Sequence, residues 1–218
     1  MRRPGPRAAV MVVVVLGAAG LLAACGVPSP TDGRTPVTLS DGSTAMQWGD
    51  GEYGVVLVAD NWDTLAGWAP LAVEIAAHRM TALAIYVSDA TRYRLAGAEV
   101  WLAEHGVQRV AFVASGQGGP GLLVVHATTG GAIDQLITIS GDLSDLDLAD
   151  LGEPPKLFTA AEGNAADAAA AERMTDAAAG DWNALLLVPG DAHGQAILES
   201  EGGPDLVAGI VARLEERR

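Results

Sequence analysis

The sequence predicts an α/β domain with a mostly parallel central sheet, helices on both faces of that sheet and an antiparallel hairpin at its N-terminal end. Two observations support this fold class. Uncharged apolar runs alternate with segments whose apolar residues recur at helical spacing, which is typical of parallel strands covered on both faces by helices. An Asp41-Gly42 turn also separates two short segments near the start of the domain, and this pattern predicts a hairpin.

The strands follow in order along the chain. The hairpin is expected at residues 37–39 and 44–48, on either side of the Asp41-Gly42 turn. Short uncharged apolar runs are expected to form strands that are buried on both faces of the sheet. They lie at residues 54–59, 83–87, 110–113, 136–139, 157–159 and 185–188.

Helices are expected between and after these strands. Their segments are residues 68–76, 92–105, about 122–126, 165–178 and 203–217. Functional sites in open α/β sheets lie beyond the carboxyl ends of the strands. The loops that reach this edge are residues 59–67, 114–120, 161–166 and 189–195.

Residues 1–24 are predicted to be a secretory signal. Three arginines, Arg2, Arg3 and Arg7, precede an uncharged apolar segment, which is the order of regions in a signal peptide. The apolar run is shorter than the ~20 residues that a membrane-spanning helix needs. An uncleaved anchor with an incidental cysteine remains the alternative.

The signal ends in Leu22-Ala23-Ala24-Cys25, which resembles the lipobox of bacterial lipoproteins. The resemblance implies cleavage before Cys25, lipidation of its thiol and attachment to the extracytoplasmic face of the cell membrane, where two or more acyl chains make a stable anchor. Residues 25–36 would then hold the lipidated cysteine and a flexible tether rich in Pro, Gly, Ser and Thr. The folded domain is expected to span residues 37–218.

Cysteine content and charge limit the chemistry of the domain. Cys25 is the only cysteine, so a lipidated mature domain has no disulfide and no cysteine ligand or nucleophile. Removal of the three leader arginines leaves 10 basic and 27 acidic residues, a net charge of −17. Such a charge argues against nucleic-acid binding and against adhesion to anionic lipid through a basic face.

Two loops carry a resemblance to the α/β-hydrolases, nearest to the small dienelactone-hydrolase-like and esterase-like members. Residues 114–118, Ala-Ser-Gly-Gln-Gly, stand where that family has its Gly-x-Ser-x-Gly nucleophile elbow. Residues 189–194, Pro-Gly-Asp-Ala-His-Gly, are similar to its Gly-x-x-His-Gly loop. The resemblance covers about residues 37–217 and implies this fold without a lid domain, ester-hydrolysing chemistry and no cofactor.

The tip of the elbow falls on Gly116. The elbow needs small residues two before and two after its tip, because the strand and the helix nearly touch there. Ser115 has Val113 and Gln117 at those positions, whereas Gly116 has an alanine and a glycine. Gln117 at the tip also fits sterically but shifts the strand by one residue. Gly116 is therefore expected in the nucleophile's place, with Ser115 on the flank of the turn.

The resemblance also implies the other members of a catalytic triad. His193 stands at the position of the general base. The position of the acid falls nearest Asn164, and Glu162, two residues before it, is a possible substitute. An amide cannot hold an imidazolium as a carboxylate does.

An oxyanion hole in this family uses two backbone N–H groups. The resemblance assigns one to Gln117 and the other to a residue among Asp60, Asn61 and Trp62. The charge of Asp60 would work against an oxyanion at that place.

Two of the three triad positions thus depart from the family pattern. We therefore expect a catalytically impaired relative, a pseudoenzyme that binds a small ligand or a partner at the cell surface. The alternative is an ester hydrolase that uses Ser115 or a water molecule activated by His193. Metal binding by Asp60, Asp191 and His193 is not expected, since no metal-ligand spacing supports it.

Overall fold

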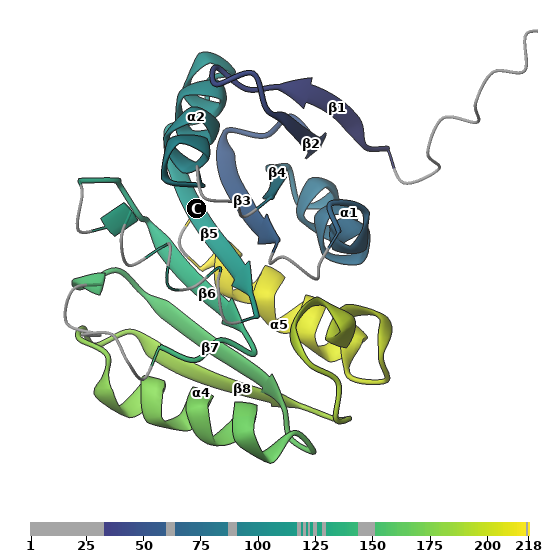
Figure 1. Cartoon of the computed structure of the whole chain (residues 1–218), viewed down its shortest axis with the longest axis vertical. Coiled ribbons are helices and arrows are strands. Elements are labelled where there is room, and N and C mark those ends of the chain that lie inside the picture. The colour runs from purple at the N-terminus through teal and green to yellow at the C-terminus, as the bar shows by residue number, and fades with distance from the viewer. Residues whose placement is uncertain are drawn as a thin grey trace, which may run out of the picture.

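The computed structural model describes residues 33–59, 64–86, 91–116, 119, 121, 123, 126–127, 130–143, 151–216 and 218. Within them, eight strands form one sheet in the order β1-β2-β4-β3-β5-β6-β7-β8, as Figure 1 shows. The strands are β1 (Thr35–Thr38), β2 (Thr44–Trp48), β3 (Tyr53–Ala59), β4 (Met80–Tyr86), β5 (Arg109–Ser115), β6 (Gln135–Ile139), β7 (Lys156–Ala161) and β8 (Asn183–Val188). β1 and β2 are antiparallel to their neighbours, and the remaining pairs are parallel.

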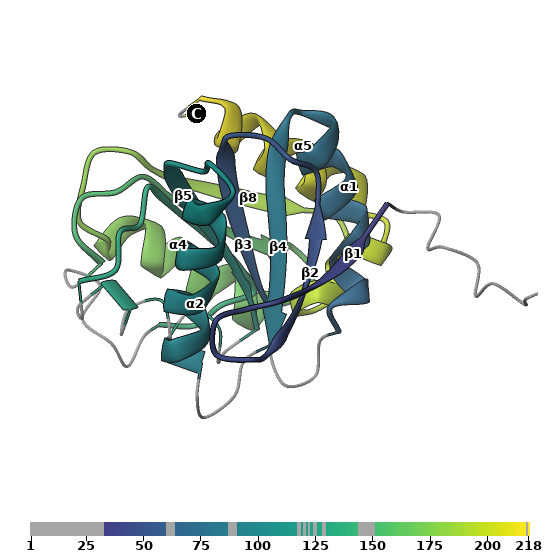
Figure 2. The same cartoon turned by 90° about the horizontal axis from the view of Figure 1, so that it is seen from above.

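Helices cover both faces of this sheet (Figures 1 and 2). They are the short 3-10 helix η1 (Ala66–Trp68), α1 (Ala69–Ala77), α2 (Thr91–Glu104), α4 (Ala165–Ala177), the 3-10 helix η3 (Gly194–Glu199) and α5 (Gly203–Glu215). Buried side chains of α1 and α5 pack in one core cluster. Those of α2 and α4 pack in a second cluster on the opposite face. The predicted α/β fold class is therefore confirmed.

The central strand β3 shows why the sheet is covered on both sides. All seven of its residues are buried. Val55 and Leu57 contribute to the cluster with α1 and α5, whereas Val56 and Val58 contribute to the cluster with α2 and α4. Each large apolar side chain that is buried in this way stabilises the fold by roughly 1.5–3 kcal/mol.

Several strands begin earlier than expected, and β4 differs most, by three residues. β4 starts at Met80, although the apolar pattern placed its start at residue 83. Arg79 adopts a left-handed conformation with φ 58°, which ends the turn after α1 and leads the chain directly into the strand. The residues that the apolar pattern left out, such as Thr81, are also buried.

Lys156, the single lysine of the chain, is a structural residue. Its side chain is fully buried, and Nζ donates to the carbonyl oxygens of Gly152, Pro154 and Ala179 at 2.7, 2.9 and 2.8 Å. Burial lowers the pKa of this ammonium group, and the negative charge of Glu153 acts against that shift. The lysine thus ties the turn before β7 to the segment after α4.

The predicted signal peptide, Cys25 and most of the predicted tether lie outside the described residues. Among the residues that are described, no helix has both the length and the apolar character needed to cross a membrane.

Candidate functional site

The carboxyl ends of β5, β6, β7 and β8 lie side by side. Ser115 pairs with Ile139, which pairs in turn with Thr159, and Ala161 pairs with Val188. The turns after β5, β7 and β8 therefore meet at one edge of the sheet, where the sequence placed the candidate residues.

The turn after β5 begins with Gly116 in a left-handed backbone conformation. Gly116 follows the strand directly and has φ 67°, in the left-handed region that the elbow tip requires and that glycine adopts without strain. Its N–H donates to the carbonyl of Ile139 at 3.0 Å. A Cβ atom at Gly119 would lie only 3.1 Å from the Cβ of Ala114, so the strand and this residue approach closely. Gly118, the small residue two after Gly116, lies outside the described residues. The tip of the turn carries no side chain.

Ser115 is the last residue of β5, and its side chain is fully buried. The backbone of Gly194 approaches it, since a Cβ atom at Gly194 would lie 3.7 Å from the Ser115 Oγ and 3.6 Å from the Gly116 nitrogen. Gly194 has φ 56°, which also favours glycine there. The loop of residues 189–194, which contains His193 and is called the histidine loop below, therefore packs directly on the turn after β5. The Ser115 hydroxyl lies beneath it.

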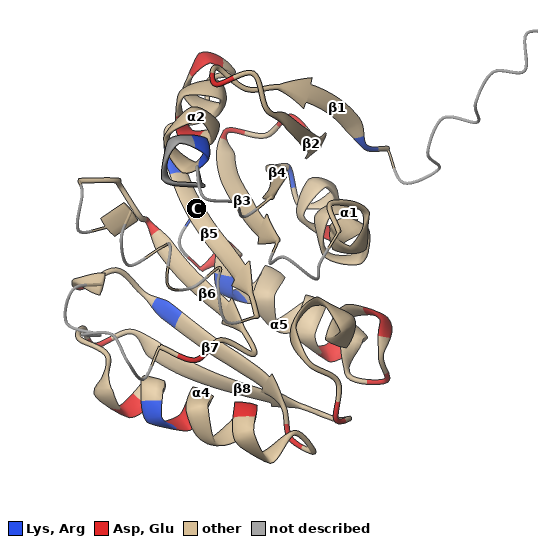
Figure 3. Ribbon diagram, viewed as in Figure 1, with Lys and Arg blue, Asp and Glu red and all other residues tan. Residues whose placement is uncertain are grey.

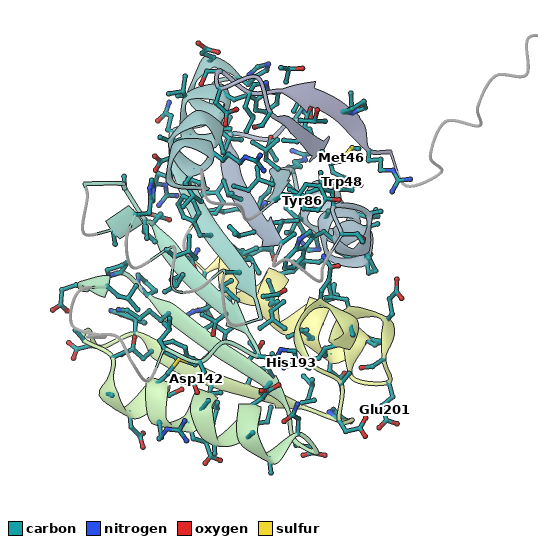
Figure 4. All side chains as sticks on the ribbon, in the orientation of Figure 1. Met46, Trp48, Tyr86, Asp142, His193 and Glu201 are labelled. Carbon is teal, nitrogen blue, oxygen red and sulfur yellow. The ribbon has the colours of Figure 1, made fainter. Side chains whose placement is uncertain are left out.

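His193 lies at this edge, among the tips of the strands (Figure 4). It has an extended backbone and precedes η3. Its Nδ1 is 2.6 Å from the Oδ2 of Asp167, and the two side chains are 50% and 14% exposed. This histidine–carboxylate pair is the arrangement by which a carboxylate orients a general base.

The partner of His193 corrects our expectation. We expected Asn164 or Glu162, but the carboxylate that contacts the imidazole is Asp167, in the first turn of α4. Glu162 is exposed. The helix begins at Ala165, which brings residue 167 back toward the loop that precedes it.

Asn164 holds that carboxylate in place. Its Oδ1 accepts a hydrogen bond from the backbone N–H of Asp167 at 3.3 Å, and its Nδ2 donates to the Oδ2 of Asp167 at 2.9 Å. Asn164 is thus the N-cap residue of α4. The spacing of Asn164 and Asp167 is that of a capping box, and this signal in the sequence could have identified Asp167.

Gln195 fastens the histidine loop to the segment after β3, and the sequence did not suggest it. Its side chain is buried, Oε1 accepts from the backbone N–H of Thr64 at 3.0 Å, and Nε2 donates to the carbonyl of Thr64 at 2.9 Å. A Cβ atom at Gly67 would lie 2.1 Å from Oε1, so a larger residue there would displace the Gln195 amide from Thr64. The residues assigned to an oxyanion hole, Gln117, Asp60 and Asn61, lie outside the described residues.

Three cavities are described, and none of them includes Gly116 or His193 in its lining. One of about 690 Å³ lies beside Tyr53, Arg79 and Arg109 at the amino ends of the strands. One of about 570 Å³ lies between α1 and α5, and one of about 540 Å³ lies beside α2.

Acidic residues are spread over helices and loops and outnumber basic ones (Figure 3). In the described part of the chain, no three His, Cys, Asp or Glu side chains are grouped to hold a metal ion.

Comparison of sequences identifies no relative. No protein-family model matches the chain, and no curated protein matches it significantly.

Comparison of structures identifies the fold. Dienelactone hydrolase from Anabaena variabilis superposes with a TM-score of 0.64 at 17% identity, over 84% of this chain and 95% of that one. Est1E from Butyrivibrio proteoclasticus gives 0.62 at 13% identity, over 85% and 98%. A soluble variant of monoglyceride lipase from Saccharomyces cerevisiae gives 0.62 at 10% identity, over 80% and 91%. The chain has the α/β-hydrolase fold.

Proposed function

We propose that this chain is a membrane-anchored lipoprotein that has kept the α/β-hydrolase fold but lost the serine-hydrolase mechanism, and that it binds a small ligand or a partner at the cell surface. The observation that carries the proposal is Gly116, which stands at the tip of the elbow with φ 67°. A serine hydrolase forms its acyl intermediate on a hydroxyl at this place, and glycine has none.

Ser115, the described hydroxyl next to Gly116, is poorly placed to replace the missing one. Ser115 is fully buried, and the backbone of Gly194 packs against it. A nucleophile has to meet the substrate carbonyl directly, and a hydroxyl in this position is covered. The base, His193, is thus present without the group whose proton it would take.

The rest of the site keeps its order. Asp167 and Asn164 hold His193, and Gln195 connects the histidine loop to the segment after β3. An ordered polar edge of this kind is suited to hold a ligand, because its hydrogen-bonding groups are already positioned. A neutral ester or another small acceptor-bearing molecule is the ligand class that the hydrolase fold suggests.

Lipid on Cys25 would place this site at the extracytoplasmic face of the cell membrane. The order of charged leader, apolar run and Leu22-Ala23-Ala24-Cys25 supports this localisation. Residues 26–36 would then separate the folded domain from the lipid as a flexible tether.

A second candidate function follows from the His193–Asp167 pair. When Asp167 accepts the hydrogen bond from Nδ1–H of His193, the other ring nitrogen, Nε2, carries a lone pair that can accept a proton. A water molecule could then attack an ester carbonyl and give its proton to Nε2, which returns it to the leaving alkoxide, so that an acid and an alcohol form. The observation that favours this hydrolytic activity is the distance of 2.6 Å between Nδ1 of His193 and Oδ2 of Asp167.

Labelling with a fluorophosphonate, which modifies activated serines, tests the first proposal. The membrane-anchored wild type is compared with its Ser115→Ala and His193→Ala variants. We expect no labelling of any of the three. Labelling of the wild type that disappears in both variants would contradict the proposal and would identify Ser115 as a nucleophile.

A further inference from the structure

The two edges of the sheet differ in how they are protected. β1, at one edge, has only four residues and includes Pro36, which has no N–H to offer to another strand. β8, at the other edge, has six residues and contains neither a charge nor a proline. Proteins normally protect an exposed edge with such residues, because an open edge pairs with other chains. The β8 edge lacks this protection.

The outer side of β8 presents a regular set of backbone groups. The carbonyls of Trp182 and Val188 accept hydrogen bonds from the N–H groups of Lys156, the first residue of β7, and Glu162, the residue after it, so the even-numbered residues direct their backbone toward β7. Alternate residues of a strand point to opposite sides, and Asn183, Leu185 and Leu187 therefore direct their N–H and C=O groups away from it. Within the described residues, no strand pairs with β8 on that side.

Apolar side chains are exposed along the same strand. Trp182, just before β8, is 58% exposed, and Leu185, in its middle, is 38% exposed. Figure 1 shows β8 at the margin of the sheet that is remote from the hairpin. Exposed apolar side chains next to free backbone groups are typical of a surface for strand addition.

We propose that β8 is an interface between two copies of this chain, which pair antiparallel about a two-fold axis so that their sheets become continuous. The three outward-facing residues are symmetric about Leu185. An axis at Leu185 therefore places this residue opposite its counterpart and Asn183 opposite Leu187 of the second copy. Every outward N–H then meets a carbonyl, as an isologous contact requires.

Charge favours a second copy as the occupant. Two molecules that each carry a large negative charge associate more readily through a surface without charges, and β8 is uncharged. In the register centred on Leu185, Asp181 lies opposite Pro189 and Asp191 lies opposite Ala179. No acidic residue of one strand segment therefore faces an acidic residue of the other.

Cross-linking in membranes tests the interface with the full chain. Because Cys25 is the only native cysteine, Leu185→Cys adds one thiol that faces its own counterpart at a distance suited to a disulfide. Val73→Cys on α1 is the matched control, since Val73 is also 38% exposed. We expect a disulfide-linked dimer of Leu185→Cys under oxidising, non-reducing conditions, and none of Val73→Cys or of the wild type.

A charge exchange provides an independent readout. Leu185→Lys and Leu185→Glu should each weaken self-association by about fivefold or more, because like charges would face each other across the axis. A mixture of the two variants should restore it. Equal cross-linking of Leu185→Cys and Val73→Cys would overturn the proposal, as would cross-linking of Leu185→Cys to a different protein or unchanged self-association of both charged variants.

Discussion

The imidazole of His193 is held by the carboxylate of Asp167 at 2.6 Å, on the same edge of the sheet as Gly116, the residue at the tip of the elbow. Gly116 itself offers no side chain that this pair could activate. Our proposal that the chain has kept the scaffold of a hydrolase without its covalent chemistry is therefore testable by single substitutions.

Restoring the hydroxyl should create reactivity. We predict that Gly116→Ser becomes labelled by a fluorophosphonate, because His193 is already oriented by Asp167. The serine has to adopt the left-handed backbone of Gly116, so a loss of about 1–3 kcal/mol in the free energy of unfolding should accompany it. Asp167→Asn in the same background should reduce the labelling rate by a factor on the order of 10²–10⁴. Equal rates with and without Asp167 would show that this carboxylate does not orient the base.

Much of this arrangement could be predicted from the sequence. The apolar runs placed the strands well, because a strand buried on both faces has no alternative to a continuous apolar segment. The small residues two before and two after Gly116 likewise selected this glycine as the tip of the turn that the family resemblance implies, and Gly116 has the left-handed backbone that suits such a place. In both cases the constraint is local in the sequence.

Two features of the site depend on where segments distant in the sequence meet. Asp167 contacts His193 only because α4 begins at Ala165 and turns the carboxylate toward a loop that lies 26 residues further on. Gln195 and Thr64 are 131 residues apart. No local pattern marks Gln195, whereas the capping spacing of Asn164 and Asp167 offers a weak signal.

The connection between Gln195 and Thr64 should contribute to stability. Gln195→Leu keeps the volume but takes away the acceptor of the Thr64 backbone N–H and one of two donors to its C=O, which still accepts from the Gly67 N–H. We expect a loss of about 2 kcal/mol in the free energy of unfolding and faster hydrogen exchange of the Thr64 amide. Gln108→Leu, a substitution at an exposed glutamine, is the control and should change neither quantity. An unaltered exchange rate in Gln195→Leu would show that this side chain does not hold the segment after β3.

Lys156 should be among the residues that the fold tolerates least. Lys156→Met keeps the apolar stem but removes the donor to three half-buried carbonyl oxygens, of which, among the described residues, only that of Ala179 keeps another donor, the Nδ2 of Asn183. We expect the free energy of unfolding to fall by about 3 kcal/mol in denaturant titrations. Arg173→Met, which removes an exposed pair with Asp142 at 3.9 Å, should cost less than about 1 kcal/mol. Similar losses for the two variants would argue against the structural role of Lys156.

The anchor is tested by fractionation. We predict that Cys25→Ser moves the protein from the membrane fraction to the soluble fraction, because the thiol that carries the lipid is lost. Metabolic labelling with a fatty acid should mark the wild type and not the variant. If both proteins remain with the membrane and neither incorporates the fatty acid, the lipoprotein assignment is wrong.

Ester turnover tests the central claim most directly. The initial rate of hydrolysis of a short p-nitrophenyl ester is measured for the wild type, for His193→Ala and for buffer alone. Because Gly116 provides no nucleophile, we expect the wild type to hydrolyse the ester no faster than His193→Ala. A wild-type rate well above that of His193→Ala would contradict the loss of catalysis, and the dependence of that rate on Ser115 would then distinguish a serine nucleophile from a water molecule activated by His193.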